Sequence, residues 1–212
     1  MNYRFLIAAL PLLALAGCQS AYYATMEQFG VEKRDILVDR VEDARDAQQD
    51  TKEEFRDALD QFTSLMNYDG GDLEKVYNKL NAQFESSEKA AGDVHDRIRE
   101  IERVSSDLFD EWNKELEQYS NMELKRKSRD SLRATEASYL AMMRKMRAAE
   151  DSMYPVLDLF RDQVLFLKHN LNARAIASLD TETAAIEEEV RKLIEDMEAS
   201  IAEADAFIAS MR

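Results

Sequence analysis

Two histidines, His95 and His169, are the residues in this chain best suited to bind a metal ion. A di-iron site in a helical bundle pairs histidine with a glutamate three residues earlier on the same helix. The residues at those positions are Gly92 and Phe166, so the sequence predicts no metal centre. We expect His95 to lie on a polar helix face, whereas His169 sits in an expected turn and is more open to a binding role.

The catalytic motifs that depend on glycine do not fit this sequence. The glycine positions exclude a Gly-x-Ser-x-Gly nucleophile elbow and a glycine-rich phosphate loop. Asp69 and Asp72 flank a glycine pair, but their spacing is not that of a calcium loop. We therefore expect no cofactor and no catalysis, and predict that the protein is not an enzyme.

Cys18 is the only cysteine, and it directly follows an apolar stretch at residues 5–16. This stretch has the length of a signal-peptide core and is too short to cross a bilayer as a helix. The sequence Leu15-Ala16-Gly17-Cys18 resembles the lipobox of bacterial lipoproteins. The resemblance implies that residues 1–17 are a cleaved signal peptide and that Cys18 carries acyl chains such as palmitate. Residues 18–25 would then be the lipid anchor and a short linker.

The residue after the cysteine bears on location. In the sorting rule of enteric bacteria, an aspartate there retains a lipoprotein in the inner membrane, but this chain has Gln19. The resemblance therefore implies an anchor in the outer membrane, with the protein facing the periplasm. In a non-enteric host the choice between inner and outer membrane stays open.

The formal net charge of −15 opposes binding to nucleic acid, because such binding neutralises phosphates with cations.

Composition favours long helices. Only five glycines and two prolines occur in 212 residues, too few to punctuate a many-stranded fold. Apolar residues recur every seven positions, which predicts helices at about residues 26–67, 72–119, 121–169 and 173–211.

The connections between these helices are short. Gly70 and Gly71 mark the first turn, Ser120 and Glu123 fit a capping box, and Pro155 is expected to kink the third helix without ending it. Short turns make consecutive helices antiparallel. We therefore predict an all-α fold, an elongated antiparallel four-helix bundle of coiled-coil-like helical hairpins. It forms a single domain over residues 26–212.

Two segments, residues 32–38 and 160–172, resemble a proteobacterial lipoprotein family catalogued as domain of unknown function 2959. The resemblance extends over nearly the whole chain after the leader. It implies an all-α protein of the cell envelope. It implies no established activity and no catalytic residues.

A cluster of cations opens the third helix, at the end of the bundle that the topology shares with Cys18. One hypothesis is that these residues contact anionic lipid head groups at the membrane surface. The competing reading is an ordinary solvated face with a Glu123–Lys127 pair. The residues are Lys125, Arg126, Lys127 and Arg129, with Arg133 one turn further.

The opposite end is a candidate partner-binding tip, because residues 164–167 are apolar on all sides. The competing reading is a tip closed by four helices over their own loops. The candidate residues of this tip are Val164, Phe166, His169 and Asn172.

The function that fits these features is structural or interactive. We expect a lipid-anchored rod that contacts an envelope protein, peptidoglycan or a second copy of itself, and the oligomeric state stays open. The alternative is a bundle that binds or senses an apolar ligand or lipid in a lining of soft side chains. That lining would consist of Met142, Met143, Met146 and Met153.

Overall fold

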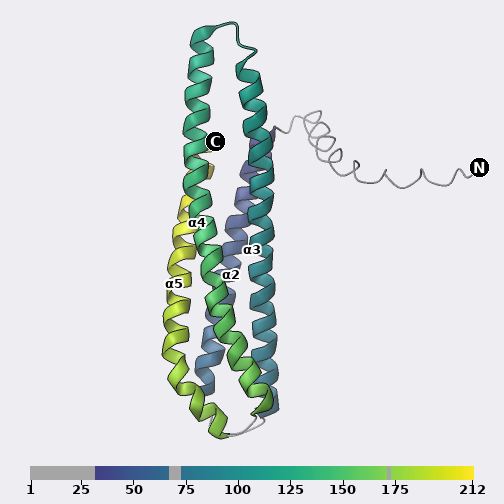
Figure 1. The fold of residues 1–212 in the computed structure, drawn as a ribbon, viewed down its shortest axis with the longest axis vertical. Coiled ribbons are helices and arrows are strands. Elements are labelled where there is room, and N and C mark those ends of the chain that lie inside the picture. Colours follow the sequence, from purple (N-terminus) through teal and green to yellow (C-terminus); the bar gives the residue numbers. More distant parts are fainter. Residues whose placement is uncertain (1–31, 67–72, 171–172) are drawn as a thin grey trace, which may run out of the picture.

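The structure, a computed structural model, describes residues 32–66, 73–170 and 173–212, the backbone alone for 65–66 and 173–182. It confirms the all-α four-helix bundle. The helices are α2 (Lys33–Met66), α3 (Leu73–Leu116), α4 (Met122–His169) and α5 (Ala173–Met211). At 1.5 Å per residue, α4 is about 70 Å long, so the bundle is a rod (Figure 1). Cys18 and the leader lie outside the described residues.

The four helices form a closed ring of neighbours. The helix α2 packs against α3 and α5, and α4 packs against the same two helices (Figure 1). Ion pairs between helices fix the antiparallel register, with Arg45 Nη1 2.9 Å from Asp205 Oδ1 and Arg161 Nη2 3.0 Å from Glu88 Oε1. Each helix therefore buries one stripe against two neighbours.

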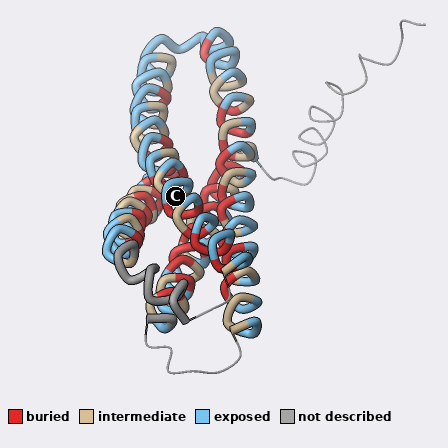
Figure 2. The backbone as a smooth tube through the Cα atoms, turned by 60° about the horizontal axis from the view of Figure 1, so that its bottom comes forward, coloured by how far each residue is buried: buried red, intermediate tan, exposed pale blue. Residues whose placement is uncertain are grey.

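The core consists of the apolar rows that repeat every seven residues (Figure 2). On α2, Val41, Phe55 and Phe62 are buried. The ring of Phe160 stacks on that of Phe62 at 4.6 Å and lies 6.2 Å from that of Phe55. Aromatic stacking adds to the free energy gained from burial. The buried methionines of the core are Met142, Met143, Met146, Met153, Met197 and Met211.

Several local expectations need correction. The residue that caps α4 is Asn121 and not Ser120, because the Asn121 side chain accepts hydrogen bonds from the backbone N–H groups of Glu123 and Leu124. The helix α2 begins at Lys33, and Glu32 is not helical. The earlier part of the expected helix, residues 26–31, and the turn at 68–72 lie outside the described ranges. As expected, Pro155 does not end α4, and its ring is exposed.

The pair α3 and α4 extends past the other two helices at one end (Figure 1). Lys33 Nζ, at the start of α2, lies 2.8 Å from Glu111 Oε1. The chain of α3 then continues to Leu116, and α4 begins at Met122. We call residues 112–133 the hairpin end. Tyr119 lies seven residues after Trp112, on the same row, but it is exposed here, because α2 and α5 as described stop short of it.

Candidate functional site

The cations predicted to meet a membrane all lie at the hairpin end. Lys125 Nζ contacts Glu117 Oε2 at 3.0 Å, across the turn between α3 and α4. This hydrogen bond, with the charge attraction that accompanies it, lowers the pKa of the Glu117 carboxyl. Lys125 therefore helps to close the turn, and most of its side chain is covered.

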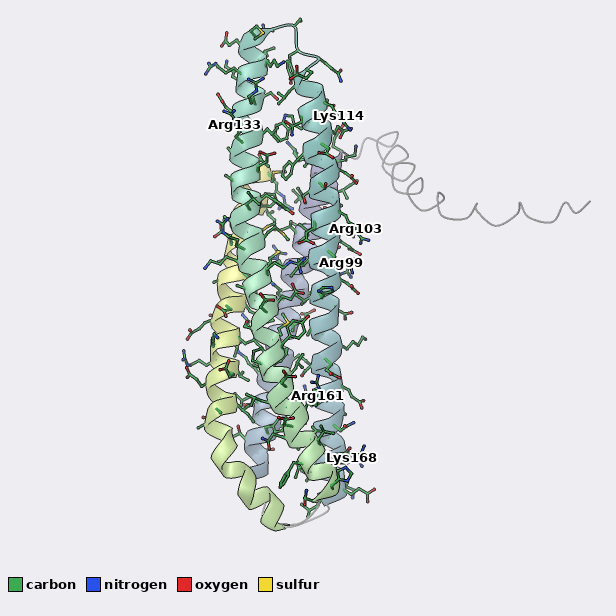
Figure 3. The ribbon with its side chains drawn as sticks, in the orientation of Figure 1. Arg99, Arg103, Lys114, Arg133, Arg161 and Lys168 are labelled. Atoms are coloured by element: carbon green, nitrogen blue, oxygen red, sulfur yellow. The ribbon has the colours of Figure 1, made fainter. Side chains whose placement is uncertain are left out.

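The other cations of the cluster face solvent. Lys127 Nζ lies 3.0 Å from Glu123 Oε1, as expected for an i,i+4 pair. Arg126 makes a longer contact of 3.7 Å with Asp130 Oδ2. Arg129 and Arg133 are exposed and form no salt bridge among the residues that the structure describes. Figure 3 shows Arg133 on α4 and Lys114 on α3, both where the two helices extend alone.

Three large apolar side chains surround the same turn, and sequence reasoning missed them as a group. The exposed fractions are 39% for Tyr119, 74% for Met122 and 51% for Leu124. Below the turn, Trp112 is partly buried and its Nε1–H donates to Ser128 Oγ at 2.9 Å, which ties α3 to α4. The hairpin end therefore combines a closed turn, an exposed apolar tip and cations around it.

The four residues proposed for the distal tip do not form one surface. Val164 is buried in the core, so it is not available to a partner. Phe166 and His169 are exposed, and Leu165 is exposed beside them. Asn172 lies outside the part of the chain that the structure describes. The run 164–167 is apolar on all sides, and the helix turns two of its four residues, Val164 and Leu167, into the core.

A polar network between α3 and α4 was not predicted. Glu150 is only 4% exposed, yet its carboxylate has two partners. Its Oε1 lies 2.5 Å from His95 Nδ1, and its Oε2 accepts a hydrogen bond from Arg147 Nη1 at 2.6 Å. Arg147 also donates to Glu102 Oε1 at 2.5 Å, so four side chains join two helices. His95 lies on a polar face as expected, with 40% of its side chain exposed, and it also pairs with a buried carboxylate.

The network changes the ionisation of its neighbours. Burial lowers the pKa of Arg147, but its hydrogen bonds to Glu102 and Glu150 and the attraction of their charges together raise it by more, so the net shift is upward. Burial raises the pKa of Tyr139, which lies beside Ser105. The i,i+3 spacing of Arg147 and Glu150 was the one signal in the sequence, but spacing does not reveal burial. These side chains link α3 to α4, and Arg147 pairs with the carboxylates of both Glu102 and Glu150.

The described surface has hollows that are partly open to solvent. One of about 570 Å³ lies between α2 and α3 and is lined by Gln61, Val76, Leu80 and Gln83 among others. Within the described ranges, no three His, Cys, Asp or Glu side chains are placed to hold a metal ion. None of the described helices has a stretch long and apolar enough to span a bilayer.

Comparison with known proteins places the chain in a family. A family model described as "Protein of unknown function (DUF2959)" matches residues 22–211. The chain belongs to this family. The match covers all four helices and the hairpin end, and it begins four residues after Cys18. No curated protein and no solved structure matches the chain. Because the family description names no activity, function has to be argued from the residues and their geometry.

Proposed function

We propose that this protein is a lipoprotein of the bacterial cell envelope, anchored through Cys18 in the outer membrane and facing the periplasm. The observation that carries this proposal is the sequence Leu15-Ala16-Gly17-Cys18 after an apolar leader. A diacylated cysteine with a further acyl group on its amine holds a protein far more durably than one chain does. In this proposal the four-helix rod is the part that the anchor presents to the periplasm.

The proposed role of the rod is structural or interactive and does not involve catalysis. Two polar contacts near the core support this view, because they join helices instead of converging on a cavity. Glu150 is paired twice, and Ser200 Oγ donates to Gln48 Oε1 at 2.7 Å. A rod about 70 Å long offers long flanks and a distal end to an envelope protein, to peptidoglycan or to a second copy.

The anchor is tested by labelling cells with radioactive palmitate. We expect the full-length protein to take up label and to sediment with outer membranes, and Cys18→Ser to lose the label and the membrane association. A matched control is Ser20→Ala, which leaves the lipobox intact and should be labelled normally. Equal labelling of Cys18→Ser, or no labelling of the wild type, would refute the anchor.

The interaction role is tested by photo-crosslinking in living cells. A crosslinking amino acid replaces Phe166 or His169 at the distal end, both of which are exposed. The control replaces Phe160, which is fully buried against Phe55 and Phe62. We expect a discrete product from the exposed positions and none from position 160. Absence of any product from positions along the distal end and both flanks would contradict an interaction role.

One observation favours the second candidate, a bundle that binds an apolar ligand. Met142, Met146, Met153 and Met197 are fully buried, and methionine adapts its shape to an inserted molecule. Heating the purified protein with and without a lipid extract separates the two candidates. A melting temperature raised by the extract supports a ligand, whereas an unchanged one supports the rod.

A further inference from the structure

We propose that the hairpin end is a second membrane contact, in which the turn between α3 and α4 inserts apolar side chains into the surface of an anionic bilayer. This inference rests on the proposed lipid anchor, which would hold the tip near its bilayer. It adds an orientation, because the rod would meet the membrane at its hairpin end, with the opposite end directed away from the bilayer.

The first support is position. The start of α2 is level with Glu111, since Lys33 pairs with it at 2.8 Å. From there α3 continues for about 8 Å to Leu116, and the turn adds to this length. Arg212, directly after α5, pairs with Glu42 on the third turn of α2, so α5 also stops short of the turn between α3 and α4. The turn is therefore the outermost described part of the end at which the chain enters α2 (Figure 1).

The second support is the chemistry of the tip. Seven large apolar side chains are exposed among the described residues, and three of them lie within six positions at this turn. Met122 is the most exposed of the seven. Tyrosine is enriched where apolar chains meet head groups, and Tyr119 stands beside Met122 at the tip. An apolar tip at the end of a charged rod fits a lipid surface better than it fits water.

The third support is charge. Residues 112–133 contain six lysines and arginines against four acids, in a chain whose net charge is −15. Among the four helices, only α4 has more cations than acids, with ten lysines and arginines against seven aspartates and glutamates. Arg126 and Arg129 follow Met122 by about one and two turns, at the depth where head-group phosphates would lie. A neutral or cationic partner would gain nothing from these cations.

The reach of the chain allows both contacts on one bilayer. Fourteen residues, 19–32, separate Cys18 from α2. Such a segment can span at most about 50 Å, several times the distance from the start of α2 to the tip. The anchor therefore permits the tip to touch the membrane and does not pull it away.

The experiment uses the mature chain from Gln19 onward, which keeps all four helices but carries no lipid. It is mixed with vesicles of phosphatidylethanolamine and phosphatidylglycerol at about three to one, or with neutral phosphatidylcholine vesicles, and pelleted. We expect the wild type to bind the anionic vesicles, and to bind them less as salt rises. The absence of any such binding would overturn the proposal.

Two matched pairs of variants locate the contact. Met122→Ser with Leu124→Ser should weaken binding at least tenfold, whereas Leu140→Ser with Tyr154→Ser, at positions of α4 that are also exposed but remote from the turn, should change it less than twofold. Arg126→Glu with Arg129→Glu should abolish the preference for anionic lipid. Arg99→Glu with Arg103→Glu, on the middle of α3 (Figure 3), should leave that preference intact. Equal effects in either pair would overturn the proposal, provided that circular dichroism shows unchanged melting.

A fluorescent probe reports insertion directly. The chain from Gln19 onward has no cysteine, so Met122→Cys or Leu140→Cys can be labelled with an environment-sensitive dye. We expect a blue shift on anionic vesicles at position 122 only. A blue shift at position 122 that grows with protein concentration in the absence of vesicles would instead identify a contact between copies and overturn the proposal.

The tests of the anchor and of the tip are independent. Palmitate labelling depends on Cys18, whereas vesicle binding by the chain without lipid depends on the tip, so either test can fail while the other succeeds.

Discussion

His95 Nδ1 lies 2.5 Å from Oε1 of Glu150, and this contact joins an exposed edge of α3 to a carboxylate that α4 buries. Buried charges are tolerated when partners satisfy both oxygens, and Arg147 contacts the second one at 2.6 Å. Further along the bundle from the hairpin end, α3 and α4 are thus joined by the side chains of His95, Glu102, Arg147 and Glu150, which we call the polar clamp. Above the clamp, Trp112 and Lys125 continue the connection with their bonds to Ser128 and Glu117.

Removing the buried carboxylate should destabilise the bundle. Glu150→Ala leaves His95 without this partner and Arg147 with Glu102 alone, and we expect the free energy of unfolding to fall by about 2–3 kcal/mol. This is less than for fully buried partners, because 40% of the His95 side chain is exposed. Urea denaturation measures the loss. The neighbouring exposed variant Asp151→Ala should change stability by less than about 0.5 kcal/mol, and equal losses would contradict a structural clamp.

Tyr139 should make the protein sensitive to alkali. Because burial raises its pKa above the usual value of about 10, the unfolded chain releases this proton at a lower pH than the folded one. The stability contributed by the neutral phenol is complete below about pH 10 and is lost as pH rises through the folded pKa. Chemical denaturation from about pH 9 to 12 should therefore show a steeper loss for the wild type than for Tyr139→Phe. Parallel curves would contradict this assignment.

The buried pair Gln48 and Ser200 should reduce stability relative to an apolar pair. Ser200 donates to Gln48 Oε1, but Gln48 Nε2 has no partner among the described residues, and neither side chain is exposed. Ser200→Ala alone should lower the free energy of unfolding by about 1–2 kcal/mol, because a second polar atom loses its partner. Gln48→Leu combined with Ser200→Ala should match or exceed the wild type. Thermal denaturation distinguishes the single from the double variant.

The cap of α4 can be assigned by mutation. Asn121→Ala removes the acceptor of two backbone hydrogen bonds, at 3.0 and 3.1 Å, and should cost about 1 kcal/mol. Ser120→Ala should cost less than about 0.5 kcal/mol, since Asn121 and not Ser120 receives those bonds. Differential scanning calorimetry of both variants is sufficient. A larger loss at Ser120 would restore the capping box that the sequence predicts.

The sequence by itself determined the fold class and most of the core. Apolar residues every seven positions define which stripe of each helix is buried, and Val41, Ile98, Met146 and Val190 all lie in the core as their rows require. The scarcity of glycine and proline likewise left long helices as the natural choice. These features depend on local periodicity, which a sequence displays directly.

The tertiary structure alone decided where each stripe ends and which charges are buried. A heptad row shows the apolar face of a helix, but it does not show how far the neighbouring helices extend to cover that face. Tyr119 is therefore on the row yet exposed, whereas Val164 is in an apolar run yet buried. Glu150 became a buried charge only because His95 and Arg147, 55 and three residues away, meet it in space. Relative helix length and long-range pairing are properties of the packed bundle.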